Sequence, residues 1–173
     1  SMSLAMLDGG HPVRLVSGGT PAASPLAFVH DRSGPGARRA LLDRTIDVVV
    51  ATHPDADHIS GLSDVFARYR VRYFLEPGVE NDTSATLRLK DAVSREPGVE
   101  TMLARRGQRF TLGGGAYADI LYPNGDVSKL ETNTGSIIMR VVYGETEFML
   151  TGDAPLSIEN WLVSQKGNLK SDV

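Results

Sequence analysis

Residues 45–58 read TIDVVVATHPDADH, and this stretch decides the fold class. The segment 45–51 is rich in β-branched residues and almost continuously apolar, which predicts a strand buried on both faces. Directly after it come four potential metal ligands within six positions: His53, Asp55, Asp57 and His58. Loops at the carboxyl ends of strands in α/β sheets are where ligand sites tend to form. The stretch therefore predicts a site between a buried strand and a helix.

The residues that follow predict alternating helices and strands. Apolar side chains recur at helical spacing after the cluster, at Ile59, Leu62, Val65, Phe66 and Tyr69. Further along, the pattern predicts a strand over 71–75, a helix over 83–95 and a strand over 99–103. Strand, helix, strand, helix, strand is the order of a layered sheet with parallel strands. The middle of the chain is therefore expected to be α/β.

Both ends of the chain are β-rich. Before the middle part we expect strands over 4–7, 12–16 and 25–29, and a short helix over 37–42. After it we expect strands over 108–112, 116–122, 136–143 and 146–151, and a helix starting near Pro155. The last two strands are joined by Gly144-Glu145, a two-residue hairpin loop. The prediction is a mixed α/β (α+β) four-layer αββα sandwich, with two sheets inside and helices outside.

Composition limits the functional classes. The chain has 173 residues, no cysteine and a formal net charge of −3, which predicts one domain over 1–173 without disulfides or thiolate chemistry. A wide basic face for DNA does not fit this charge. The longest apolar run, 48–51, is far shorter than the roughly 18–20 residues of a membrane span, and no secretory leader is expected. Residues 1–3 resemble a cloning remnant.

The cluster at 53–58 has the chemistry of a metal site. Imidazole and carboxylate together suit divalent cations such as Zn, Mn or Fe, and a cation would remove the repulsion between Asp55 and Asp57. Taken singly, each residue has an ordinary explanation: Asp57 as a helix N-cap, or a histidine as a solvated loop residue. The four together favour a metal. Asp153, at the end of the late hairpin, is a further candidate that could bridge two cations.

The residues His53-Pro54-Asp55-Ala56-Asp57-His58 resemble the HxHxDH motif of metallo-β-lactamase-fold hydrolases, with Asp55 in place of the second histidine. This HxDxDH variant, followed by residues 59–62, is similar to the soluble C-terminal domain of ComEC competence proteins and their stand-alone relatives. A second block, from Asn133-Thr134-Gly135-Ser136 to Asp153, resembles the same subgroup. The resemblance covers most of the chain, from about residue 4 to 173.

The resemblance implies roles for the site residues. His53 and Asp55 would serve one metal position, Asp57 and His58 the other, and Asp153 would bridge them. Asp57 would also be the catalytic residue that orients the attacking water. Asn133 stands where larger relatives carry another histidine. The family's last histidine segment lies beyond residue 173, so the resemblance implies a C-terminally incomplete domain that binds metal weakly.

The implied activity is metal-dependent hydrolysis. A divalent cation lowers the pKa of water from 15.7 towards about 7 and polarises the group under attack. The resemblance implies a phosphodiesterase or nuclease that acts on DNA during competence and DNA uptake, with up to two divalent ions, Mn or Zn. Replacing imidazoles by Asp55 and Asn133 favours Mn for activity. Two groups of arginines are candidate phosphate contacts or, alternatively, ordinary solvated charges: 68, 70 and 72, and 105, 106 and 109.

Two other functions stay open. The same fold could hydrolyse a small ester or thioester, because fold does not determine function. The chain could also be a non-catalytic binding domain with a degraded metal site. The sequence leaves the compartment and the oligomeric state undetermined.

Overall fold

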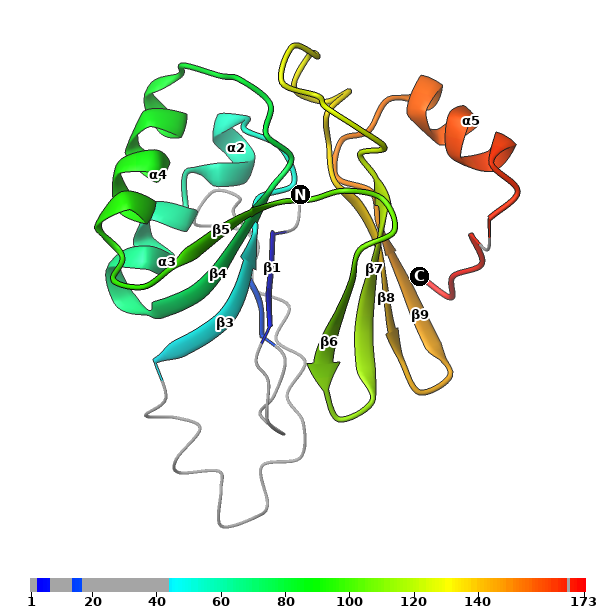
Figure 1. Cartoon of the computed structure of the whole chain (residues 1–173), viewed down its shortest axis with the longest axis horizontal. Helices are drawn as coiled ribbons and strands as arrows, with labels where there is room; N and C mark the ends of the chain where they lie inside the picture. Colours follow the sequence, from blue (N-terminus) through cyan, green and yellow to red (C-terminus); the bar gives the residue numbers. More distant parts are fainter. Residues whose placement is uncertain (1–2, 7–13, 17–43, 168) are drawn as a thin grey trace.

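Two β-sheets pack face to face, with helices on both outer faces (Figure 1). The computed structural model describes residues 3–6, 14–16, 44–167 and 169–173. The expected strand over 25–29 and helix over 37–42 lie outside the described residues. None of the helices in the described ranges is long and apolar enough to cross a membrane.

The first sheet has five strands in the order β2-β1-β3-β4-β5. Their bounds are β1 (Ser3–Met6), β2 (Arg14–Val16), β3 (Thr45–Val50), β4 (Arg70–Glu76) and β5 (Glu100–Leu103). β1 is antiparallel to both β2 and β3, whereas β3, β4 and β5 run parallel. The predicted alternation of strand and helix is confirmed, since helices connect the parallel strands.

Three helices cover the outer face of this sheet: α2 (Ala56–Ile59), α3 (Leu62–Arg68) and α4 (Ser84–Arg95) (Figure 1). The periodicity from Ile59 to Tyr69 predicted one helix, but the chain forms two, with Gly61 as the N-cap of α3. Glycine is a poor helix former, and the break falls where it stands. On α4, Leu89 is buried, whereas Leu87 is 54% exposed.

The second sheet is a four-stranded antiparallel meander in the order β6-β7-β8-β9. Its strands are β6 (Arg109–Gly113), β7 (Ala116–Tyr122), β8 (Ile138–Tyr143) and β9 (Thr146–Leu150), and α5 (Leu156–Ser164) covers its outer face. The predicted hairpin loop is confirmed: Tyr143 pairs with Thr146, and Gly144 has φ +59°. Beyond α5, Val173 lies beside β9, because its amide donates to the carbonyl of Glu147 and its carbonyl accepts from Met149.

Apolar side chains fill all three interfaces between the four layers. The core between the sheets includes Val50, Leu75, Ile120, Ile137 and Met139. A second cluster lies between the first sheet and helices α2 to α4, and a third joins the second sheet to α5 through residues such as Tyr122, Ile138 and Leu162. Strand β3 contributes Val50 to the first cluster and Val49 to the second. The four-layer αββα sandwich is therefore confirmed, including the strand buried on both faces.

Candidate metal centre

The loop after β3 is held between the two sheets. The amide of Ala51 donates to the carbonyl of Leu75 (2.9 Å) in the first sheet. The carbonyl of the next residue, Thr52, accepts from the amide of Ile137 (2.8 Å), directly before β8 of the second sheet. Both sheets therefore fix the backbone directly before His53, so the first histidine is presented from a rigid support.

His53 is fully buried, with 0% of its side chain exposed. Its Nδ1 lies 3.1 Å from the hydroxyl oxygen of Thr52. Its Nε2 has no hydrogen-bond partner among the described residues and lies 3.9 Å from the Asp55 carboxylate. Burial lowers the pKa of His53, and the neighbouring His58 lowers it further, although nearby carboxylates oppose the shift. The neutral imidazole, the form that binds metals, is therefore favoured.

His58 packs against His53 from the short helix α2. The two ring centroids are 3.9 Å apart, and only 3% of the His58 side chain is exposed. Its Nε2 lies 3.4 Å from a carboxylate oxygen of Asp57 and 3.3 Å from one of Asp153. Its Nδ1 is buried and has no hydrogen-bond partner in the described part of the chain. One nitrogen of His58 thus faces two carboxylates.

The alternative interpretation of Asp57 as an N-cap is wrong. The N-cap of α2 is Asp55, and its side chain makes no capping hydrogen bond, while Asp57 lies inside the first turn. Neither carboxylate therefore caps the N-terminus of α2. Asp57 is the most exposed of the cluster, at 71%, so its carboxylate lies on the solvent side.

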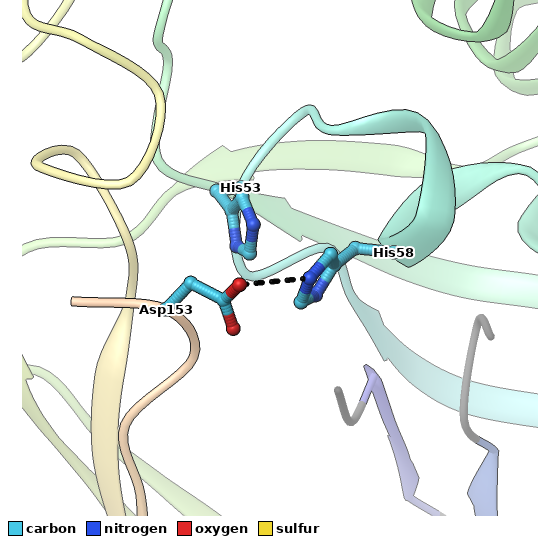
Figure 2. A group of neighbouring side chains, drawn as sticks. All are labelled: His53, His58 and Asp153. Atoms are coloured by element: carbon cyan, nitrogen blue, oxygen red, sulfur yellow. Dashed lines mark ion pairs between the residues drawn. The ribbon is translucent and has the colours of Figure 1, made fainter.

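Asp153 reaches the histidines from the other sheet (Figure 2). It follows β9 and the turn at Gly152, whose φ of +56° is in the left-handed region. A Cβ on Gly152 would lie 3.3 Å from Cβ of Thr52 and 3.2 Å from Cβ of Ser136. The glycine therefore lets the chain pass close to the histidine loop and place the Asp153 carboxylate beside His58.

The geometry of the cluster fits a divalent cation. His53, His58 and Asp153 each offer one ligand atom, and these atoms all lie within 4.8 Å of one another. In a tetrahedral site with bonds of 2.0–2.1 Å, neighbouring ligand atoms are about 3.4 Å apart. The separations of Nε2 of His58 from Asp57 and Asp153 are 3.4 and 3.3 Å. Two buried imidazoles beside the carboxylates of Asp57 and Asp153 form a suitable donor set, and Asp55 can complete it.

The sequence did not reveal the role of Thr52. Its hydroxyl contacts Nδ1 of His53, and such second contacts fix the tautomer and orientation of a metal-binding imidazole. Asn133 and Ser136, from the second motif block, have buried side-chain oxygens without hydrogen-bond partners among the described residues. Ser136 lies beside Gly152. The positions of these two residues in the sequence do not indicate this contact.

Replacing Thr52 by valine tests its role. We expect Thr52→Val to weaken metal affinity roughly tenfold, because the isosteric side chain no longer orients His53. The affinity is measured by competition with a chromogenic chelator. The control is Thr146→Val, which makes the same change at an exposed position at the start of β9. Equal affinities of the two variants would show that the Thr52 hydroxyl does not support the site.

The first group of arginines lies far from the cluster. Arg70 pairs with Thr45 at the start of β3, whereas His53 follows the end of that strand. The six residues of β3 span about 20 Å, so this group lies at the opposite end of the sheet. Arg72 forms an ion pair with Asp47 (2.8 Å).

The second group of arginines has partners within the protein. Arg105 donates to the carbonyls of Pro77 (2.8 Å) and Ala104 (2.6 Å). The guanidinium of Arg106 lies 5.2 Å from the centroid of the Trp161 ring. Arg109 donates twice to Asp119, its cross-strand neighbour. These contacts favour structural roles over phosphate binding.

A comparison with protein families agrees with this architecture. The model of the metallo-beta-lactamase superfamily matches residues 17–170. Two similar solved structures are CmlA, a diiron beta-hydroxylase from Streptomyces venezuelae (17% identity, TM-score 0.46), and Igni18, a metallo hydrolase from Ignicoccus hospitalis (13% identity, TM-score 0.42). Each match covers 95% of this chain, but only 33% of CmlA and 66% of Igni18.

No curated protein matches the chain. The superfamily match nevertheless extends over most of the sequence, including the whole cluster from His53 to His58 and Asp153. The chain belongs to the metallo-beta-lactamase superfamily.

Proposed function

We propose that the chain is a metal-dependent hydrolase whose centre consists of His53, Asp55, Asp57, His58 and Asp153. The observation that carries the proposal is the meeting of two buried imidazoles, each with an unpartnered nitrogen, with a carboxylate from the opposite sheet. Buried polar atoms without partners are costly, so such a group calls for a ligand. A divalent cation beside the carboxylates would satisfy Nε2 of His53 and would bind Nε2 of His58, the nitrogen that faces Asp57 and Asp153.

Each of the five residues has a proposed role in metal binding or catalysis. His53 and Asp55 would hold one metal position, Asp57 and His58 would hold the other, and Asp153 would serve both; the distances of 3.9, 3.4 and 3.3 Å between these side chains support this division. When bound, a divalent cation supplies Lewis acidity for polarising the substrate and activating water. Asp57, the most exposed carboxylate, accepts a hydrogen bond from the attacking water and orients it towards the substrate.

The proposed substrate is a phosphodiester, with DNA as the polymer. Support comes from the resemblance of 53–62 and 133–153 to the ComEC type. A mildly acidic chain can act on an acidic polymer when cations screen the contact, so the net charge of −3 is compatible with this substrate.

A small carboxylic ester or thioester is the second candidate substrate. The arginine contacts favour it, because the second group of arginines is occupied within the protein and the first lies at the far end of the sheet. A small neutral ester needs no such cationic surface. The non-catalytic alternative makes a different prediction, namely metal binding without turnover.

The deciding experiment compares three proteins on two substrates. Wild type, Asp57→Ala and Asp64→Ala are assayed on linear DNA and on a chromogenic ester, with Mn²⁺ and after chelation. Asp64 is an exposed acid on α3 outside the cluster, and it controls for loss of a carboxylate. We expect wild type and Asp64→Ala to cleave DNA, and Asp57→Ala to fall to background. Equal cleavage by all three would refute the catalytic role, and ester cleavage alone would favour the second substrate.

The ligand set predicts a metal preference. Three carboxylates join only two imidazoles in the cluster, and oxygen-rich sites suit Mn²⁺ better than imidazole-rich sites do. We therefore expect faster hydrolysis with Mn²⁺ than with Zn²⁺ when each metal is supplied alone to the chelated protein. Turnover with Zn²⁺ that equals or exceeds that with Mn²⁺ would contradict this expectation.

A further inference from the structure

A cavity of about 280 Å³ lies between helix α4 and the first sheet. Phe74 and Thr101 are cross-strand neighbours on its sheet wall, and Leu89 and Val93 lie on its helix wall. Most of the lining is apolar, and Phe74 and Leu89 are themselves buried. The volume lies just below the roughly 300 Å³ at which pockets for drug-sized ligands begin, so only a smaller molecule would fit.

Two opposite charges interrupt this apolar lining, Glu76 and Lys90. Side chains alternate along a strand, so Glu76 faces the helices together with Phe74, while Leu75 faces the other sheet. Lys90 follows Leu89 on the cavity side of α4. Among the described residues, neither side chain takes part in an ion pair or a side-chain hydrogen bond, although each acts on the other electrostatically.

The surroundings leave Glu76 in need of a partner. The side chain is half-buried, and this burial raises the pKa of its carboxyl group; Lys90 opposes the shift but does not cancel it. A cationic group close to Glu76 would remove this penalty. Lys90 is exposed and can in turn receive an anion.

The cavity is distinct from the metal cluster. Of the five cluster residues only His53 lines it, together with the adjacent Pro54. Thr86, on α4, also lines the cavity and donates from its hydroxyl to the carbonyl of Pro54 (3.3 Å), so the helix contacts the histidine loop there. A molecule in the cavity would touch the back of the histidine loop and would not contact Asp57, His58 or Asp153.

We propose that this cavity binds a free α-amino acid with an aliphatic or aromatic side chain. Its ammonium group pairs with Glu76, its carboxylate pairs with Lys90, and its side chain fills the apolar space between Phe74 and Leu89. Both protein charges are then matched, and the complex adds no net charge to the cavity.

Other classes of ligand satisfy the cavity less well. A purely apolar molecule would displace water from Glu76 and Lys90 without replacing its hydrogen bonds. A phosphate or another simple anion would pair with Lys90 but would be repelled by Glu76. A metal cation would pair with Glu76 but would be repelled by Lys90. Only a zwitterion with an apolar body uses both charges and the apolar walls.

Calorimetric titration in the presence of a chelator tests the proposal. The chelator removes metal from the cluster, so the result does not depend on the proposed hydrolase function. L-leucine and L-phenylalanine are compared with isopentylamine and 4-methylpentanoate, which each keep only one charge, and with glycine, which lacks the apolar body. We expect the two amino acids to bind at least about tenfold more tightly than the three analogues.

Matched charge variants locate the site. Glu76→Gln and Lys90→Gln are each expected to weaken leucine binding at least about tenfold. Glu145→Gln and Lys166→Gln, at exposed positions outside the cavity, should bind like wild type. No measurable binding of either amino acid at 10 mM (about the weakest affinity expected of so small a ligand), or equal binding by all four variants, would overturn the proposal.

Discussion

Replacing His58 by alanine is expected to weaken metal affinity by more than about 100-fold, beyond the range of second contacts, and to reduce hydrolysis to background. The physical reason is the position of Nε2, which lies within 3.4 Å of carboxylates from two different segments, at Asp57 and Asp153. Without this nitrogen, the site loses the metal ligand that lies between the two carboxylates, and the carboxylates repel one another. Metal content after dialysis and chelator competition measure the loss.

His58 is buried, so loss of the side chain could also disturb packing. His58→Asn keeps a smaller but polar side chain at this position, and unfolding in a chelator separates stability from metal binding. We expect both His58 variants to remain folded, with metal affinity lost. Asp64→Ala again controls for a change outside the cluster, since Asp64 is an exposed residue of α3. Wild-type affinity in both His58 variants would remove this residue from the site.

Replacing Gly152 by alanine is expected to lower the free energy of unfolding by about 2–4 kcal/mol. Part of the cost is the positive φ of +56°. The rest is crowding, because the new Cβ would lie 3.2 Å from Cβ of Ser136 and 3.3 Å from Cβ of Thr52. Relief of the crowding moves Asp153 away from His58, so metal affinity should fall as well.

Gly144→Ala is a matched control for this substitution. Gly144 has nearly the same φ, +59°, but no atom lies within 4 Å of the position of its Cβ. We expect it to cost only the backbone strain, about 1–2 kcal/mol, with metal affinity unchanged. Urea unfolding of both variants in a chelator, and metal titration of both, give the comparison. Equal effects of the two substitutions would show that the close approach at Gly152 does not position the site.

The sequence predicted the layers well because each depends on local pattern. The almost continuously apolar segment at 45–51 favours burial on both faces, and β3 does contribute to two cores. The hairpin loop that begins at Gly144 also follows from local chemistry. The helix break at Gly61 was missed because the apolar spacing continues across it and outweighed the glycine.

The candidate site was predictable in part. The residues at 53–58 are adjacent in sequence, so their grouping needed no tertiary information. The approach of Asp153 to the histidines, and of Ser136 to Gly152, depends on packing of one sheet against the other, which no local pattern encodes. The hydrogen bond between Thr52 and His53 depends on side-chain rotamers, and neither residue type alone indicates it.

The cluster draws its members from both halves of the sandwich. The histidines follow β3 in the first sheet, and Asp153 follows β9 in the second. A cation bound by both therefore acts as a cross-link at the open end of the two layers. The unfolded chain does not bring these ligands together, so the ion would bind only the folded protein. The free energy of metal binding would therefore add to the free energy of unfolding. Opening of the layers at this end then requires release of the ion, so amide protons at the ends of β3 and β9 should slow their exchange together when metal is added.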